Sequence, residues 1–151
     1  MEMTAATMQA RMAETVARVL RQACRKWAPP RKIKTRDWAN KYRYLSSIEA
    51  ARPGKYVLDV TPYLAWENSP LDALDDPSVQ VVVCQKSAQV AWTSGVLGNF
   101  LGKSIDAEPS PILVLFPKEG AAKEYMDEKF VPMVEATPAL REKVDTRIRA
   151  Q

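Results

Sequence analysis

The stretch that most constrains the fold of this chain runs from Val79 to Gly98 and reads VQVVVCQKSAQVAWTSGVLG. It begins with a β-branched apolar run, residues 79–83, whose length and flanks predict a buried strand. A polar turn over residues 85–89 follows, and Ala91 to Ser94 then open an apolar helical segment. A strand, a tight loop and a helix start form the arrangement in which backbone N–H groups bind phosphates. The sequence therefore predicts a phosphate-binding loop.

The loop matches the motif G-x-x-x-x-G-K-[ST] only in part. Thr93 stands at the hydroxyl position, Ala91 at the second glycine and Trp92 at the lysine. Lys86 stands at the first glycine, so a lysine is present but at the front of the loop. Taken by itself, this match also fits an unrelated α/β protein in which KSAQVAWT merely closes a strand–helix turn.

A second continuous apolar run, Ile112–Phe116, follows the helix that starts near Trp92. Such a run suits a strand that is covered on both faces of a sheet. Two strands joined through a helix form a βαβ unit, for which parallel pairing and a right-handed crossover are the default. The predicted fold class is therefore α/β.

The N-terminal residues predict an amphipathic helix that Thr4 or Thr7 caps and that Ala28-Pro29-Pro30 ends. Residues 1–44 carry eleven Lys and Arg against three acids, a net charge of +8, whereas the remainder carries −4. A basic arm of this kind can bind nucleic acid through phosphates. A solvated helix face followed by a linker explains the same charge. The apolar stripe on this helix consists of Met8, Met12, Val16, Leu20, Cys24 and Trp27.

Between the arm and the loop, short elements are expected. Thr35 is predicted to cap a helix over 36–44, with Trp38 packed inward or, as the alternative, stacked on a base. A short strand over 56–60 should follow, and then a helix that starts at Thr61-Pro62 and is interrupted at Ser69-Pro70. After the second apolar run, helices are expected over 121–134 and from Thr137-Pro138 through Ile148.

Composition excludes several classes of protein. The chain has no histidine and two cysteines in different contexts, which argues against a zinc site and a Ser-His or Cys-His nucleophile pair. We expect Cys24 and Cys84 to be reduced packing residues, consistent with a cytoplasmic location. No run approaches the ~18 apolar residues that a membrane helix needs. No secretory signal is recognisable.

The order of residues in the loop, Lys86-Ser87-Ala88-Gln89-Val90-x-x-Thr93, resembles the variant phosphate loop of phage terminase large subunits of the lambda GpA type. The resemblance extends from about Asp37 to Val144. Its further pieces are Asp37-Trp38-Ala39-Asn40, Leu45-Ser46-Ser47, Pro53-Gly54-Lys55-Tyr56, Thr61-Pro62-Tyr63 and Phe116-Pro117-Lys118.

This resemblance implies a basic N-terminal helix and linker (residues 1–35) and a truncated P-loop ATPase-like domain (residues 36–151). It implies ATP and Mg²⁺ as cofactors, the small terminase subunit and double-stranded DNA as partners, and the host cytoplasm as location. Lys86 would be the catalytic lysine, Thr93 a Mg²⁺ ligand and Tyr63 a contact of the adenine. The expected nucleotide-binding residues are Tyr63, Lys86, Ser87, Ala88, Gln89, Val90, Ala91, Trp92 and Thr93.

Two departures from the family pattern limit the expected activity. Ala91 replaces the usual glycine, which costs about 1 kcal/mol if the residue is left-handed. No apolar strand that ends in two carboxylates follows Ile112–Phe116, since Asp75-Asp76 and Asp127-Glu128 are expected on loop or helix. We therefore expect this chain alone to bind nucleotide weakly and to hydrolyse it poorly. The alternative function is a non-catalytic remnant or binding module that acts through its basic helix.

Overall fold

The computed structural model describes residues 5–27 and 29–144, and it divides the chain into two units between Pro30 and Arg31. Each unit is considered by itself. The predicted cap at Thr7 was wrong, because Thr7 lies inside the N-terminal helix. The helix predicted from Pro138 through Ile148 ends at Arg141, and residues 142–144 are not helical. The cap at Thr4, the helix end at Ala28 and the side chains of Met8 and Trp27 lie outside what the structure describes.

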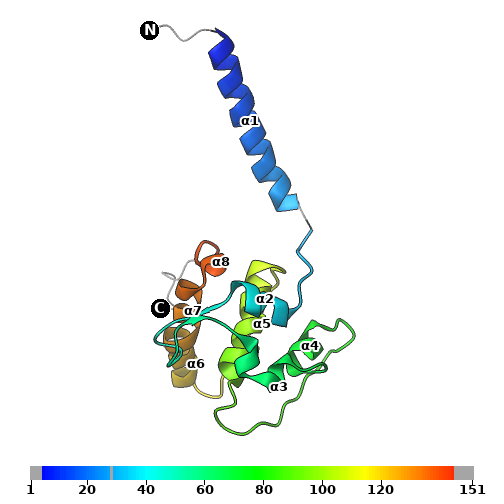
Figure 1. Ribbon diagram of the computed structural model, residues 1–151, viewed down its shortest axis with the longest axis vertical. Coiled ribbons are helices and arrows are strands. Elements are labelled where there is room, and N and C mark those ends of the chain that lie inside the picture. Colours follow the sequence, from blue (N-terminus) through cyan, green and yellow to red (C-terminus); the bar gives the residue numbers. More distant parts are fainter. Residues whose placement is uncertain (1–4, 28, 145–151) are drawn as a thin grey trace. The chain divides into compact units, whose positions relative to one another are not determined.

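The first unit is a single helix, α1 (Ala5–Trp27), which confirms the predicted N-terminal helix (Figure 1). Its apolar stripe is exposed at Met12, Val16, Leu20 and Cys24. Within the range that the structure describes, no helix, α1 included, is long and apolar enough to cross a membrane.

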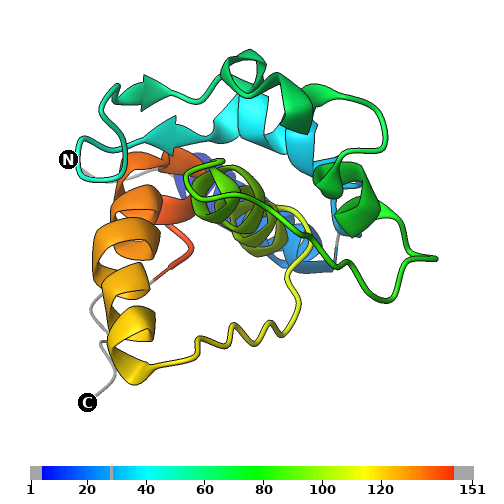
Figure 2. The ribbon, with the colours of Figure 1, turned by 90° about the horizontal axis from the view of Figure 1, so that it is seen from below.

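The second unit is mostly helical and contains one small sheet (Figures 1 and 2). Two of its helical stretches continue from one element into the next, because η2 runs into α5 and α6 runs through η3 into α7. Its elements, in chain order, are α2 (Thr35–Tyr42), β1 (Tyr44–Leu45), β2 (Gly54–Lys55), the 3₁₀ helix η1 (Leu58–Val60), α3 (Pro62–Ala65), α4 (Pro70–Asp75), the π-helix η2 (Trp92–Gly98), α5 (Asn99–Asp106), α6 (Glu119–Tyr125), the π-helix η3 (Met126–Phe130), α7 (Val131–Ala136) and α8 (Pro138–Arg141).

The core of this unit is built around Trp38, which the structure buries completely. Trp38 packs from α2 onto Gly102 of α5, where the lack of a side chain leaves room for the indole ring. The indole Nε1 donates a hydrogen bond of 2.8 Å to Asp106 at the end of α5. The buried packing predicted for Trp38 is therefore confirmed. The other buried core residues are Ala39, Tyr56, Leu58, Leu64, Leu71, Val96, Met133, Val134 and Leu140.

Two of the three helix starts that carry proline were predicted, those at Thr61-Pro62 and Thr137-Pro138, whereas Ser69-Pro70 was predicted only to interrupt a helix. The helices α3, α4 and α8 begin at Pro62, Pro70 and Pro138, where a residue without an N–H is tolerated. The prediction that Thr35 caps α2 was wrong, because Thr35 is the first helical residue. Asp75 replaces the cap from a distance: its carboxylate accepts hydrogen bonds from the backbone N–H (2.5 Å) and the hydroxyl (2.7 Å) of Thr35.

The strand predicted over residues 56–60 was also wrong. The sheet consists of β1 and β2, which pair antiparallel with Tyr44 opposite Lys55 and Leu45 opposite Gly54. Gly54 has a φ of +131°, a conformation that favours glycine and that ends the turn before β2. The chain then enters η1, so Tyr56 and Leu58 are buried without belonging to a strand.

The two strands of the predicted parallel βαβ unit are not present among the described residues. The segments 79–83 and 112–116 have no regular secondary structure and no backbone ladder (Figure 2). Most of their apolar side chains are exposed, with Val83 at 88 % and Leu113 at 81 %. A parallel strand is stable only between other strands and under helices on both faces. Among the described residues, these segments have no neighbouring strands and no helices that cover both faces. The second unit is therefore helical with one two-stranded sheet.

Candidate functional site

The predicted phosphate loop, residues 86–93, leads into η2. Gln89 and Ala91 have φ values of 56° and 52°, while Val90 between them does not have a positive φ. Successive residues of alternating handedness form a nest, a concave group of backbone N–H donors that favours anions. The sequence predicted a phosphate-binding loop here, and the local backbone has a conformation suited to that role.

The side chain of Tyr63, on α3, contacts this loop. Its hydroxyl donates a hydrogen bond of 2.9 Å to the carbonyl oxygen of Val90. Tyr63 precedes the loop by more than twenty residues, so the two segments meet through the fold and not through local sequence. The structure thus brings the predicted adenine contact next to the predicted phosphate loop.

A cavity of about 470 Å³ adjoins the loop. Its volume lies within the range of roughly 300–1,000 Å³ that is typical of small-molecule sites. Five of the nine predicted nucleotide-binding residues line it: Tyr63, Lys86, Ser87, Val90 and Trp92. The rest of the lining is mainly apolar and consists of Leu64, Pro70, Val83, Cys84, Gln85 and Val96.

The other four predicted residues, Ala88, Gln89, Ala91 and Thr93, do not line this cavity. Thr93 and Gln89 are exposed. Lys86 is also exposed, and its ammonium makes one long hydrogen bond of 3.4 Å, to the carbonyl oxygen of Ser87. Within the described part of the chain Lys86 has no carboxylate partner, so its charge is free to meet an anion.

Ala91 is in the left-handed conformation, with φ 52° and ψ 22°, as the glycine position of the motif requires. A Cβ in this region costs about 1–2 kcal/mol. We therefore expect Ala91→Gly to raise the free energy of unfolding by about 0.5–1 kcal/mol, after allowance for the greater freedom of glycine in the unfolded chain.

Thermal unfolding of the Ala91→Gly and Ala88→Gly variants would measure this effect. Ala88 lies in the same loop without a positive φ, so its replacement by glycine should lower the stability by up to about 1 kcal/mol. Equal changes at the two positions would contradict the strain at Ala91.

Carboxylates are scarce around the loop. Asp127 and Glu128 lie on η3, and Asp75 ends α4, which confirms that these acids belong to helices and not to the end of a strand. In the described residues there is no group of three His, Cys, Asp or Glu side chains that could hold a metal ion. The fit to Mg²⁺ therefore rests on the Thr93 hydroxyl and the phosphates of a bound nucleotide.

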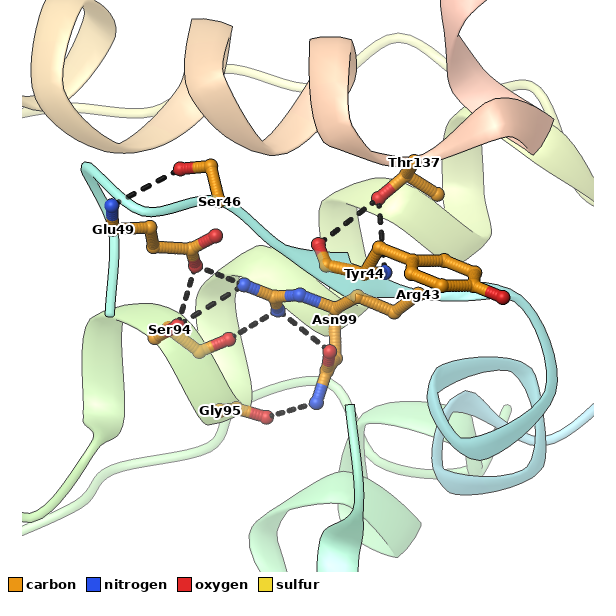
Figure 3. A network of polar contacts seen from close by, with 8 residues as sticks. All are labelled: Arg43, Tyr44, Ser46, Glu49, Ser94, Gly95, Asn99 and Thr137. Carbon is orange, nitrogen blue, oxygen red and sulfur yellow. Dashed lines mark hydrogen bonds and ion pairs between the residues drawn. The ribbon is translucent and has the colours of Figure 1, made fainter. Parts of the chain in front are cut away.

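A buried polar network just beyond the loop was missed by the sequence analysis (Figure 3). Arg43 donates to the carbonyl oxygen of Ser94, to the Ser94 hydroxyl at 3.0 Å and to Asn99 Oδ1 at 2.6 Å, and it forms an ion pair with Glu49. The Ser94 hydroxyl in turn donates to Glu49 at 2.5 Å. Burial lowers the pKa of Arg43, and the neighbouring carboxylate of Glu49 opposes that shift.

One sequence signal could have pointed to this network. Gly95, Gly98 and Gly102 recur at helical spacing along η2 and α5, which indicates a helix face that another group approaches closely. At Gly98 that group is Arg43, because a Cβ there would lie 2.8 Å from Nη1.

Comparison with known families decides the identity of the domain. Residues 50–151, about two thirds of the chain, match the model of the phage terminase large subunit gpA, ATPase domain. The chain belongs to this family. No curated protein and no solved structure matches this chain.

Membership in the gpA ATPase family confirms the resemblance found in the sequence and, with it, a place among phage DNA-packaging ATPases. The matched range includes Tyr63 and the whole loop. The family resemblance seen at Asp37-Trp38-Ala39-Asn40 lies before the matched range, and Arg43 and Glu49 precede it as well.

Proposed function

We propose that this chain forms the N-terminal part of the ATPase domain of a terminase large subunit and binds ATP with Mg²⁺ at residues 86–93. In the complete enzyme, hydrolysis of that ATP would drive translocation of DNA into the capsid. The observation that carries the proposal is the cavity shared by Tyr63 and Lys86 beside the nest at residues 89–91. Tyr63, Lys86 and Val90 line this cavity, so an aromatic side chain, a cation and the middle residue of the nest adjoin the same space.

Each group has a distinct role in this proposal. The Lys86 ammonium and the backbone N–H groups that follow it neutralise and hold the phosphates. Thr93 would hold Mg²⁺ through its hydroxyl, and the ion would supply charge neutralisation at the phosphates. Tyr63 contacts the base, with its ring held in place by the hydrogen bond to Val90. Trp92, Val90 and Ser87 complete the walls of the cavity.

We also propose that the chain binds nucleotide better than it hydrolyses it. Hydrolysis requires a carboxylate or amide that orients the attacking water. The carboxylates of Asp75, Asp127 and Glu128 belong to helices, and none of them lines the cavity.

Replacing Lys86 tests the phosphate site. We expect Lys86→Ala to weaken Mg²⁺-dependent binding of a fluorescent ATP analogue by at least about tenfold, since a hydrogen bond to a charged group is worth about 1.5–3 kcal/mol. Lys123→Ala, an exposed lysine on α6 outside the cavity, is the matched control and should bind as the wild type does. Wild-type protein without Mg²⁺-dependent binding, or Lys86→Ala with unchanged affinity, would refute the proposed function.

For the fold, we propose that segments 79–83 and 112–116 become parallel strands of a P-loop core when further strands of an ATPase sheet pair with them. Both segments consist of β-branched or aliphatic residues, apart from Gln80 and Phe116, and both flank the helix that follows the loop. Their exposed side chains and unpaired backbone groups have the properties of strands that lack neighbours.

Residues 1–35 form, in this proposal, a basic helix and linker that contact other components of the packaging machine in the host cytoplasm, and residues 36–151 form the ATPase part. The small terminase subunit and double-stranded DNA are the partners expected from the family. The exposed stripe residues Met12, Val16, Leu20 and Cys24 on α1 support a partner-binding role. It also supports the second candidate function, a binding module that acts through α1 without turnover.

A further inference from the structure

The first turn of η2 is held from outside the loop by a side chain that precedes it by about fifty residues. Ser94 follows Thr93 directly in the sequence. Both the carbonyl oxygen and the hydroxyl of Ser94 accept hydrogen bonds from Arg43, one from each terminal nitrogen of the guanidinium. Two such bonds to one residue fix its position and its orientation (Figure 3).

Arg43 is itself fixed by its surroundings. Its side chain is 0 % exposed and that of Glu49 is 2 % exposed. Asn99 accepts a further hydrogen bond from Arg43 and donates one of 2.7 Å to the carbonyl oxygen of Gly95, again in η2. The guanidinium also lies 5.2 Å above the centre of the Tyr56 ring.

A buried ion pair such as Arg43–Glu49 is poor evidence for a stabilising role, so its presence indicates another purpose. Desolvation of the two charges offsets much of their attraction, and apolar residues of the same volume often stabilise a core equally well. A planar guanidinium with several donors instead defines geometry, and here two of its four hydrogen bonds go to Ser94, in the turn that ends the loop.

We propose that Arg43 and Glu49 are positioning residues for the nucleotide site, which act through Ser94 to hold Thr93 where its hydroxyl meets Mg²⁺. This inference rests on the proposed function and adds to it a role for residues outside the loop. Neither residue lines the cavity, so their effect reaches the nucleotide only through η2. The proposed consequence is specific: the network governs the part of nucleotide affinity that depends on Mg²⁺.

Ser94→Ala tests the proposal in the full chain, because it removes the hydroxyl and leaves the buried charges paired. The measurement is the affinity for a fluorescent ATP analogue with and without Mg²⁺, together with thermal unfolding. We expect Ser94→Ala to lower the affinity in the presence of Mg²⁺ by about tenfold, and to change the affinity without Mg²⁺ much less. The ratio of the two affinities should therefore fall.

Thr137→Val is the matched control for loss of stability. Thr137 is buried, and its hydroxyl accepts a hydrogen bond of 3.2 Å from the backbone N–H of Tyr44, on the side of the network away from the loop. Its replacement should lower the unfolding temperature, as Ser94→Ala does, but keep the wild-type ratio of affinities.

The outcomes separate the two proposals. If the wild-type chain shows no Mg²⁺-dependent binding, the proposed function fails, and the positioning role fails with it. If the wild type binds and Ser94→Ala keeps the wild-type ratio, only the positioning role is wrong. If Thr137→Val lowers the ratio as much as Ser94→Ala does, the effect comes from general destabilisation and the positioning role is also overturned.

Discussion

Arg43→Met is expected to lower the free energy of unfolding of the second unit by about 3–5 kcal/mol, because it leaves the Glu49 carboxylate buried without its cation. Within the described structure, Glu49 Oε2 has no hydrogen-bond partner. No second cation therefore compensates the carboxylate when Arg43 is replaced. The variant also removes the donors that reach Ser94 and Asn99. Urea denaturation with a constant m-value would measure the loss.

Two further variants define the cause of this effect. Arg141→Met removes an exposed arginine whose guanidinium bonds only to the backbone carbonyl of Glu135, so a change below about 1 kcal/mol is expected. Arg43→Met combined with Glu49→Met removes both charges and should restore part of the lost stability. If the double variant were as unstable as the sum of the two single variants, an unpaired buried carboxylate would not be the reason.

Gly102→Ala should produce the second large effect. A Cβ on Gly102 would overlap ring carbons of Trp38, with Cζ3 at 2.5 Å. The indole cannot move away easily, because it is fully buried and its Nε1 is bonded to Asp106, which also pairs with Arg31 and Lys143. We expect a loss of about 3 kcal/mol, at the upper end of the usual cost of overpacking a core.

Gly120→Ala provides the control for this substitution. Gly120 lies on α6, and a Cβ there would have no atom within 4 Å. Because alanine favours a helix more than glycine does, this variant should be as stable as the wild type or more stable by up to about 1 kcal/mol. Thermal unfolding of both variants makes the comparison, and similar unfolding temperatures would show that α2 and α5 are packed less closely than the structure indicates.

The features that the sequence predicted well depend on neighbouring residues. Thr61-Pro62 and Thr137-Pro138 mark helix starts, and Ser69-Pro70 marks an interruption, through the fixed backbone angle of proline and its missing N–H. The left-handed conformation that the sequence analysis considered as a condition at Ala91 is the one that the structure has. In each case the physical cause lies within a few residues of the feature.

The predictions that were wrong concern contacts between distant segments. An apolar run such as residues 79–83 has the composition of a strand, but a strand also needs a hydrogen-bonding neighbour that composition does not reveal. Thr35 has the chemistry of a helix cap, yet Asp75 from another helix takes that role. The network around Arg43 joins this residue, which follows α2, to Ser94 of η2 and Asn99 of α5 through side chains that have no common pattern in the sequence.

The exposed segments at 79–83 and 112–116 also determine how the protein behaves at high concentration. Each presents aliphatic side chains beside backbone groups that are available for pairing, which makes it a template for other β-strands. Encounters between molecules increase with concentration, whereas the intramolecular contacts of the helical unit do not. We therefore expect dilute solutions to favour the single molecule described here, and concentrated ones to favour the assembly of several chains through these two exposed segments.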